Sequence, residues 1–313
     1  MNDFLSPTDE KQYPITLIGE ILVDEIKQRD SDDVTVHFGG SPANIALNLA
    51  DMGIKDVQFV GTVGHDHRGK ELLRTLSDNN ISTQHINVHP GMTSTVRINQ
   101  TDETPQPLFF RDADYQIEMS DPVRETISNS YILHFSYWPI SKEPAKSAIV
   151  EAVKIAKKHD VLVGFDPNYH PLLNGENIRS NDELFELMHH IDIIKPSYDD
   201  ARRIFGGNES PNTYLQMFID LGIKVVIMTL GKDGLICRQG DTTVRLPSMA
   251  TEVVDATGAG DAFLSGLYAA FLHNEDLTTA LRMGLLCSAY NLKQVGGRSQ
   301  LPNYQYLRQS LPE

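Results

Sequence analysis

Short apolar runs alternate with amphipathic segments over most of the chain. The first run covers residues 15–23 (ITLIGEILV), and others cover residues 57–63, 131–137, 161–165, 191–194 and 225–230. Between them, residues 143–158 carry apolar side chains at helical spacing. Apolar strands separated by amphipathic helices are typical of βαβ units, in which helices cover both faces of a mostly parallel sheet. We therefore predict a Rossmann-like α/β fold with a three-layer α/β/α core.

Two segments interrupt this rhythm, at about residues 24–38 and 93–113. Both contain strand-like runs around a turn-rich middle, with no helix between the strands. We expect them to form a small β-strand lid over the carboxyl edge of the main sheet, where open α/β sheets bind ligands; decorated loops are the alternative. Residues 1–13 are polar and are expected to form a flexible N-terminal tail. This leaves residues 14–313 as one domain.

The charge balance narrows the classes of partner. Among the 313 residues, 42 acidic minus 27 basic residues leave a net charge of −15. This balance argues against nucleic acid or an anionic membrane as the main partner, although it allows a phosphorylated small molecule. The amino terminus lacks the basic start and apolar core of a signal peptide, and no apolar run approaches the ~18 residues of a membrane helix. We expect a cytoplasmic protein.

The strongest candidate site is the segment from Asp255 to Asp261 (DATGAGD). Its glycines permit a tight turn, and the apolar run that follows predicts a helix. The unpaired backbone N–H groups at the start of this helix, at Ala259, Gly260 and Asp261, would form an anion site. Asp261 in the first turn could then accept a proton from a hydroxyl that attacks phosphorus. A purely structural Gly-rich turn is the alternative.

Other polar residues stand at helix starts and strand ends. In the segment GGSPAN, Ser41 and Pro42 predict a helix start, while Gly40 lets the backbone approach a ligand and Asn44 offers a donor and an acceptor. A structural helix start would explain the same residues. The predicted strand ends carry further polar or glycine residues, namely Asp24, Asp166, Asn168, Lys195, Ser197, Thr229, Gly231 and Gly234.

Two nucleotide-binding motifs are rejected. Residues 64–70 fit the start of a P-loop, but Glu71 occupies the position of the Ser or Thr that binds Mg²⁺. A carboxylate there would repel phosphate. No Gly-x-Gly-x-x-Gly motif follows the first strand, which disfavours a dinucleotide-dependent dehydrogenase.

Together, the segments Gly39–Asn44 and Asp255–Asp261 resemble the two signature motifs of the ribokinase-like (PfkB) family of carbohydrate kinases. The resemblance extends from Ile15 to about Pro302. It implies the ribokinase-like fold, ATP as phosphoryl donor, Mg²⁺ as cofactor and pairing of two copies through the lid strands.

The resemblance also implies roles for individual residues. Asp261 looks like the catalytic base, with Gly258, Ala259 and Gly260 as the anion site. The sugar would be bound by Asp24, Gly40, Asn44, Arg111, Asp166 and Asn168. The nucleotide would be bound by Lys195, Ser197, Thr229, Gly231, Gly234 and Gly260. Metal would be held by Asp200, and a monovalent cation (K⁺) by Asp255 and Thr257.

Two departures from the family pattern bear on metal and substrate. The usual Asn-x-x-Glu near the phosphates is replaced by Ser197-Tyr198-Asp199-Asp200, whose final carboxylate is one methylene shorter. The Asp-Pro-Asn-Tyr-Arg sequence of some members ends here in His170, which removes a permanent cation. We predict a sugar kinase most similar to fructokinases, producing fructose 6-phosphate. A 2-keto-3-deoxygluconate kinase or a ribokinase is the alternative within the same class of enzymes. A non-catalytic sugar or nucleotide sensor is the alternative from a different functional class.

Overall fold

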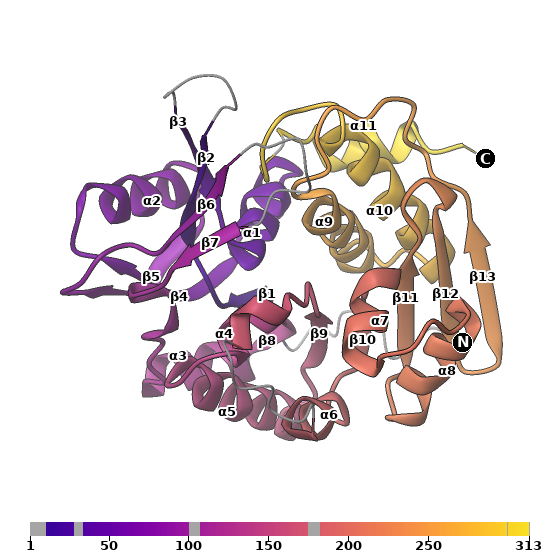
Figure 1. Cartoon of the computed structure of the whole chain (residues 1–313), viewed down its shortest axis with the longest axis horizontal. Helices are drawn as coiled ribbons and strands as arrows, with labels where there is room; N and C mark the ends of the chain where they lie inside the picture. The colour runs from indigo at the N-terminus through magenta and orange to yellow at the C-terminus, as the bar shows by residue number, and fades with distance from the viewer. Residues whose placement is uncertain (1–10, 28–33, 100–106, 175–181, 299, 313) are drawn as a thin grey trace.

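The computed structural model describes residues 11–27, 34–99, 107–174, 182–298 and 300–312. Within these residues the strands form a nine-stranded and a four-stranded sheet (Figure 1). The large sheet has the order β13-β12-β11-β10-β9-β8-β1-β4-β5, with parallel pairing from β5 to β11 and antiparallel pairing of β12 and β13. Its strands are β1 (Tyr13–Ile18), β4 (Gln58–Gly64), β5 (Ser82–His89), β8 (Ser130–Ser136), β9 (Leu162–Asp166), β10 (Ile193–Ile194), β11 (Val225–Thr229), β12 (Leu235–Gln239) and β13 (Thr242–Leu246).

Helices cover both faces of this sheet. Along β11, Val225 and Ile227 belong to one core cluster, whereas Val226 and Met228 belong to the other. One layer contains α1 (Ser41–Asp51), α2 (His67–Asp78), α9 (Ala259–Leu272), α10 (Leu277–Asn291) and α11 (Tyr304–Gln309). The opposite layer contains α3 (Asp121–Ser128), α4 (Tyr137–Ile140), α5 (Ala145–Lys158), α6 (Asp182–Met188), α7 (Tyr198–Phe205) and α8 (Pro211–Asp220). The predicted three-layer α/β/α core is confirmed.

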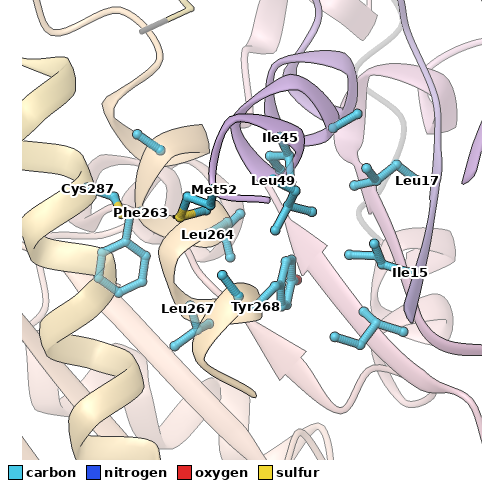
Figure 2. Packing of buried hydrophobic residues seen from close by; sticks show 14 of the residues in the cluster. Ile15, Leu17, Ile45, Leu49, Met52, Phe263, Leu264, Leu267, Tyr268 and Cys287 are labelled. Carbon is cyan, nitrogen blue, oxygen red and sulfur yellow. Dashed lines mark hydrogen bonds between the residues drawn. The ribbon is translucent and has the colours of Figure 1, made fainter. Parts of the chain in front are cut away.

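Helices α1 and α9 pack against each other and against the sheet. Ile45 and Leu49 of α1 lie between the β1 side chain of Leu17 and the α9 side chains of Leu264 and Tyr268 (Figure 2). All five side chains are fully buried. Because these apolar contacts fix the two helices relative to each other, they also fix the polar residues at the helix starts.

The sequence predicts a single strand over the first apolar run, residues 15–23. The structure has two strands there. β1 ends at Ile18, and β2 (Leu22–Lys27) belongs to the small sheet. Residues 15–23 are all buried, including Gly19 and Glu20 at the crossing point, so the burial pattern continues from β1 into the start of β2. A pattern of buried residues does not show that the chain passes from one sheet to another.

The small sheet has the order β3-β2-β6-β7, with β3 (Val34–Gly39), β6 (Thr95–Asn99) and β7 (Pro107–Phe110). The strands of this sheet largely coincide with the two segments that interrupt the βαβ rhythm, although β2 begins at Leu22 and β3 ends at Gly39, and the second sheet is confirmed. The turn-rich middles, residues 28–33 and 100–106, lie outside the described residues, as do residues 1–10 of the predicted tail. Residue 13 of that tail already belongs to β1.

The P-loop-like segment forms the start of α2. Asp66 caps this helix by accepting the backbone N–H of Gly69 at 2.8 Å, and its carboxylate also accepts the N–H and hydroxyl of Thr93, each at 2.7 Å. A carboxylate therefore occupies the centre of the turn, where a P-loop would hold phosphate. In the described parts of the chain, no helix is long and apolar enough to cross a bilayer.

Candidate active site

The turn before α9 is built for close backbone packing. Gly258, the N-cap, has a φ of 76°, and a Cβ there would lie 2.0 Å from the carbonyl oxygen of Gly297. The first helical hydrogen bond runs from Ala262 N–H to Gly258 O at 2.9 Å, while Ala259 N–H donates to Ala256 O at 3.3 Å. The N–H groups of Gly260 and Asp261 lie in the first turn, which has no preceding turn to supply acceptors. This helix start can bind an anion.

Asp261 lies in that first turn and is held at both oxygens by α1. Ser41 Oγ donates to Oδ1 at 2.7 Å, and Asn44 Nδ2 donates to Oδ2 at 2.9 Å. Ser41 and Asn44 are three residues apart, so they face the same side of the helix. The two sequence motifs that carry the family resemblance thus meet at one carboxylate.

Burial raises the pKa of Asp261 to about 7. The hydrogen bonds from Asn44 and Ser41 oppose this rise, Asp166 adds to it and Lys195 opposes it. A carboxyl group with a pKa near neutrality is well matched to the work of a general base, because a substantial fraction of it is ionised at neutral pH and it still accepts a proton readily.

A buried cation faces the same point. Lys195 follows β10, and its Nζ lies 3.0 Å from Oδ2 of Asp166, the last residue of β9. A Cβ on Gly260 would lie 3.0 Å from this ammonium, which places Lys195 directly against the start of α9. Burial alone would lower the pKa of Lys195, but the carboxylates of Asp166 and Asp200 outweigh it and raise the pKa. The ammonium therefore stays charged.

Two cavities meet at this point. A polar cavity of about 480 Å³ is lined by Asp24, Asn44, Trp138, Asp166, Lys195 and Asp261, among others. A more apolar cavity is lined by Gly231, Lys232, Gly234, Phe263, Leu285 and Ser288, among others. Thr229, Ala256 and Gly260 line both. A ligand in each cavity would have its nearest ends at Gly260, beside Asp261 and Lys195.

The far wall of the polar cavity comes from the small sheet and its neighbours. Asp24 of β2 and Val96 of β6 line it, with Trp138 of α4 opposite. The ring of Phe109 in β7 meets Trp138 edge-on at 5.1 Å between centroids. Burial, and then the nearby Asp261, raise the pKa of Asp24 to about 7. A carboxyl group beside an aromatic wall is suited to binding the hydroxyl groups and apolar face of a sugar.

Most of the predicted site residues line these two cavities. Gly40, Asn168 and Ser197 line the polar cavity, and Asn168 holds a positive φ of 35°. Thr229, Gly231 and Gly234 line the apolar cavity, near the turn between β11 and β12. The structure therefore brings together residues that are widely separated in the sequence.

Asp200 forms hydrogen bonds to nearby residues that stabilise the local fold. Ser197 Oγ accepts Asp200 N–H at 3.0 Å, and Asp200 Oδ2 accepts the N–H and hydroxyl of Ser197 at 2.9 and 2.6 Å, which forms a capping box at the start of α7. Its Oδ1 accepts Tyr169 N–H at 2.8 Å. The residue also lines the polar cavity, so one side chain both anchors α7 and faces the site.

Asp255 and Thr257 stabilise the loop before α9. Asp255 Oδ1 accepts the N–H and hydroxyl of Thr257 at 2.9 and 2.8 Å, and Oδ2 accepts Gly296 N–H at 2.8 Å. These bonds lower the pKa of Asp255 against the effect of its partial burial, and its carboxylate stays ionised. The pair therefore ties the loop around residue 296 to the turn at Gly258.

Arg111 lies apart from the polar cavity. Its guanidinium pairs with Asp114, donates to Ser141 Oγ at 2.6 Å and lies over the ring of Trp138, with Cζ 4.6 Å from the ring centroid. It lines a different cavity, together with Arg68 and other residues. In this arrangement Arg111 supports Trp138 from behind and does not line the polar cavity that Trp138 faces.

Glu20 was not predicted as a site residue. It lies just after β1, is 3% exposed and lines the polar cavity. Its only signal in the sequence is a carboxylate within an apolar run, which is rare unless the charge is paired or the group is protonated. Trp138 was also missed, because nothing in the sequence places α4 beside the small sheet.

Comparisons with known proteins agree with this geometry. The family described as pfkB family carbohydrate kinase matches residues 14–303. An ATP-dependent 6-phosphofructokinase of Thermoanaerobacterium thermosaccharolyticum is 43% identical over 96% of this chain and 94% of its own length. The solved structure of Halothermothrix orenii fructokinase is 33% identical, with a TM-score of 0.79 over 90% of this chain and 100% of that one.

A third relative has its ligands in the solved structure. A double mutant of Vibrio cholerae O395 fructokinase, in its fructose, ADP and potassium ion bound form, is 26% identical, with a TM-score of 0.82. The match covers 97% of this chain and 100% of that one. With a family match across nearly the whole length and the two signature segments joined at Asp261, this chain belongs to the pfkB family of carbohydrate kinases.

Proposed function

We propose that this protein transfers the γ-phosphoryl group of ATP to the primary hydroxyl of free fructose, forming fructose 6-phosphate. The observation that carries the proposal is the junction at Gly260, where the polar and apolar cavities meet beside Asp261 and Lys195. The sugar would occupy the polar cavity and the adenine the apolar one. Fructokinases among the relatives support the choice of sugar.

In the proposed mechanism, Asp261 accepts the proton of the fructose hydroxyl as its oxygen attacks the γ-phosphorus. The new O–P bond forms as the bond to ADP breaks, and ADP leaves with the bridging oxygen. Lys195 and the N–H groups at the start of α9 stabilise the charge on the transferring group, in a site shielded from water. Asp24, Gly40, Asn44, Asp166 and Asn168 hold the sugar, and Ser197, Thr229, Gly231 and Gly234 the nucleotide.

Two cations belong to the proposal. Asp200 would hold Mg²⁺, since Oδ1 accepts a single N–H and a carboxylate oxygen has two lone pairs, so an acceptor site remains toward the cavity. When bound there, Mg²⁺ would supply positive charge to the phosphate oxygens of ATP. Asp255 and Thr257 would hold a monovalent cation, as the potassium ion in the Vibrio cholerae structure suggests. Because the reaction consumes ATP, we place it in the cytoplasm.

A second candidate substrate is fructose 6-phosphate, favoured by the 43% identical 6-phosphofructokinase. A sugar phosphate needs a cation at the end of the sugar away from ATP. Among the described residues that line the polar cavity, the cations are Lys195, which faces Gly260, and Arg203, which donates to the carbonyl oxygen of Tyr169 at 3.1 Å. Asp24, Val96 and Trp138 line the cavity beside the small sheet. Asp24 would repel a phosphate. The same argument disfavours an acidic sugar such as 2-keto-3-deoxygluconate, while ribose would leave more of the cavity unfilled.

Release of ADP from Mg·ATP tests the proposal, with fructose, fructose 6-phosphate, 2-keto-3-deoxygluconate and ribose as acceptors. The expected result is a kcat/KM for fructose at least tenfold above the others. A preference for fructose 6-phosphate would overturn the choice of sugar and leave Asp261 and the anion site in place. Sugar binding without ADP release from any acceptor would support the non-catalytic sensor instead.

We further propose that two copies pair through the small sheet. Val36 of β3 and Leu108 and Phe110 of β7 are 56%, 48% and 48% exposed. The strand register places all three on the face of the sheet that carries Glu25, opposite the face of Asp24. A second copy would cover the exposed apolar side chains of this face with the same residues. Light scattering should give twice the monomer mass, and Leu108→Asp should give the monomer; a monomeric wild type would overturn the pairing.

A further inference from the structure

Glu20 connects three elements beneath the active site. Its Oε1 accepts the backbone N–H of Ser41, at the start of α1, at 3.1 Å. Ser136 Oγ, at the end of β8, donates to Oε2 at 2.8 Å. Glu20 itself follows β1, so its side chain joins the ends of two central strands to the first residue of a helix. No role in the proposed reaction has been given to it so far.

The start of α1 lacks a side-chain cap of its own. The N-cap residue is Gly40, which has no side chain to accept the first free N–H groups. Glu20 supplies the missing acceptor from a different element. Gly40 makes this approach possible, because a Cβ there would lie 2.4 Å from the carbonyl oxygen of Glu20. The glycine and the glutamate are therefore two parts of one arrangement.

The same residue that Glu20 caps also orients the base. Ser41 Oγ donates to Asp261 Oδ1, and the second donor to Asp261, Asn44, lies one turn further along α1. We infer that Glu20 is a positioning residue for Asp261: by binding the N–H of Ser41 it fixes the helix start that holds both oxygens of the base. The inference rests on the proposed role of Asp261 as base.

Glu20 acts through hydrogen bonds, and its charge is not needed. Burial raises the pKa of Glu20 to about 8, which keeps the group mainly protonated at neutral pH. Ser136 Oγ donates to the ionised carboxylate; in the protonated form, the carbonyl oxygen of Glu20 can still accept Ser41 N–H, and its hydroxyl can donate to Ser136 Oγ instead. A glutamine offers the same acceptor and a donor in nearly the same shape. Glu20→Gln should therefore preserve the positioning, whereas Glu20→Ala should abolish it.

Four variants test the inference: Glu20→Ala, Glu20→Gln, Ser41→Ala and the double variant Glu20→Ala/Ser41→Ala. The readouts are kcat and both KM values at saturating Mg·ATP with the best acceptor. We expect Glu20→Ala to lower kcat at least tenfold with both KM values within threefold, and Glu20→Gln to stay within threefold of wild type. In the Ser41→Ala background, loss of Glu20 should cause a smaller further decrease than in the wild type, because the bond from Ser41 Oγ to Asp261 is already lost while Asn44 still depends on the helix start.

Two outcomes would overturn the inference. One is an unchanged kcat in Glu20→Ala, and the other is a double variant in which the two losses multiply. If Glu20→Ala does not fold, Glu20→Asp takes its place, because aspartate keeps the carboxyl group but is one methylene too short to reach Ser41 N–H. Asp261→Asn is measured in parallel. Wild-type turnover in Asp261→Asn would refute the role of Asp261 as base. If Asp261→Asn loses turnover while Glu20→Ala stays as active as the wild type, only the positioning role of Glu20 is refuted.

Discussion

Gly258 packs so closely on Gly297 that a Cβ on Gly258 would stand 2.0 Å from the carbonyl oxygen of Gly297. The contact joins the turn before α9 to the loop that Asp255 also holds through Gly296 N–H. Since the anion site consists of backbone groups, its geometry depends directly on how tightly this turn is packed. An added methyl group must move either the turn or the loop.

Gly258→Ala should therefore disrupt both stability and catalysis. The left-handed φ of 76° alone costs an alanine about 1–2 kcal/mol, and the contact with Gly297 adds to that cost. Urea unfolding and kcat measure the two effects, and we expect kcat to fall by about 100-fold or more. Gly53→Ala is the matched control, because Gly53 has a φ of 89° with nothing within 4 Å of its Cβ position. Equal kcat values in the two variants would contradict the close-packing argument.

Lys195→Met should abolish turnover and destabilise the fold. The substitution leaves Asp166 buried without its cation, and breaking a buried pair in this way typically costs about 3–5 kcal/mol. Thermal unfolding and ADP release are the measurements. Adding Asp166→Asn should restore much of the stability, because it removes the unpaired charge, but should not restore turnover. If the double variant regained activity, Lys195 would have only a structural role.

Asp261→Asn should lower kcat by about 10²–10⁴-fold while sugar binding stays within a few-fold, as expected for loss of a general base. Calorimetric titration with the sugar separates binding from turnover. Sugar affinity that fell as steeply as kcat would show that Asp261 mainly binds the substrate.

The raised pKa of Asp261 also predicts how stability depends on pH. The group binds a proton more tightly in the folded protein, with a pKa of about 7, than at its ordinary value of 3.8. Its contribution to stability is present in full below pH 3.8 and is lost as the pH rises toward 7. The melting temperature of Asp261→Asn relative to wild type should thus increase over this range and level off above it. A difference independent of pH would contradict the raised pKa.

Catalysis should show the opposite dependence. A base must be ionised to accept a proton, so kcat should fall as the pH drops below about 7. Glu20, Asp24, Asp166 and Lys195 surround Asp261, and Asp24 has a similarly raised pKa. The pH profile of Asp24→Asn separates the two groups. If the decrease in kcat persists in that variant, it belongs to Asp261; if it disappears, Asp24 is the group that titrates.

The layers and the paired motifs could be predicted from the sequence, because they follow from local patterns. Alternating apolar strands and amphipathic helices determined the three layers, and glycines next to acids marked the start of α9. The passage from β1 to β2 could not be predicted, since residues 15–23 are buried without a break across it. The role of Glu20 depends on Ser136, which is 116 residues away in the chain. Such a contact becomes visible only when the sheet order is known.

The start of helix α7 could also be predicted from the local sequence. The spacing of Ser197 and Asp200 fits a capping box, and the structure forms one at the start of α7. The family pattern alone suggests metal binding for the same carboxylate. A side chain that caps a helix can still face a ligand, so helix capping and metal binding are compatible roles for Asp200.

Asp24→Ala should raise the KM for the sugar while leaving the KM for ATP unchanged. The carboxyl group of Asp24 lines the polar cavity on the side away from Gly231 and the apolar cavity, so its loss removes sugar contacts alone. A hydrogen bond from a hydroxyl to a charged group contributes about 1.5–3 kcal/mol, which corresponds to a KM increase of about 10–150-fold. Steady-state kinetics with each substrate varied in turn measures both constants. An unchanged sugar KM would remove Asp24 from the binding site, and an improved KM for fructose 6-phosphate would show that Asp24 excludes phosphorylated sugars by charge.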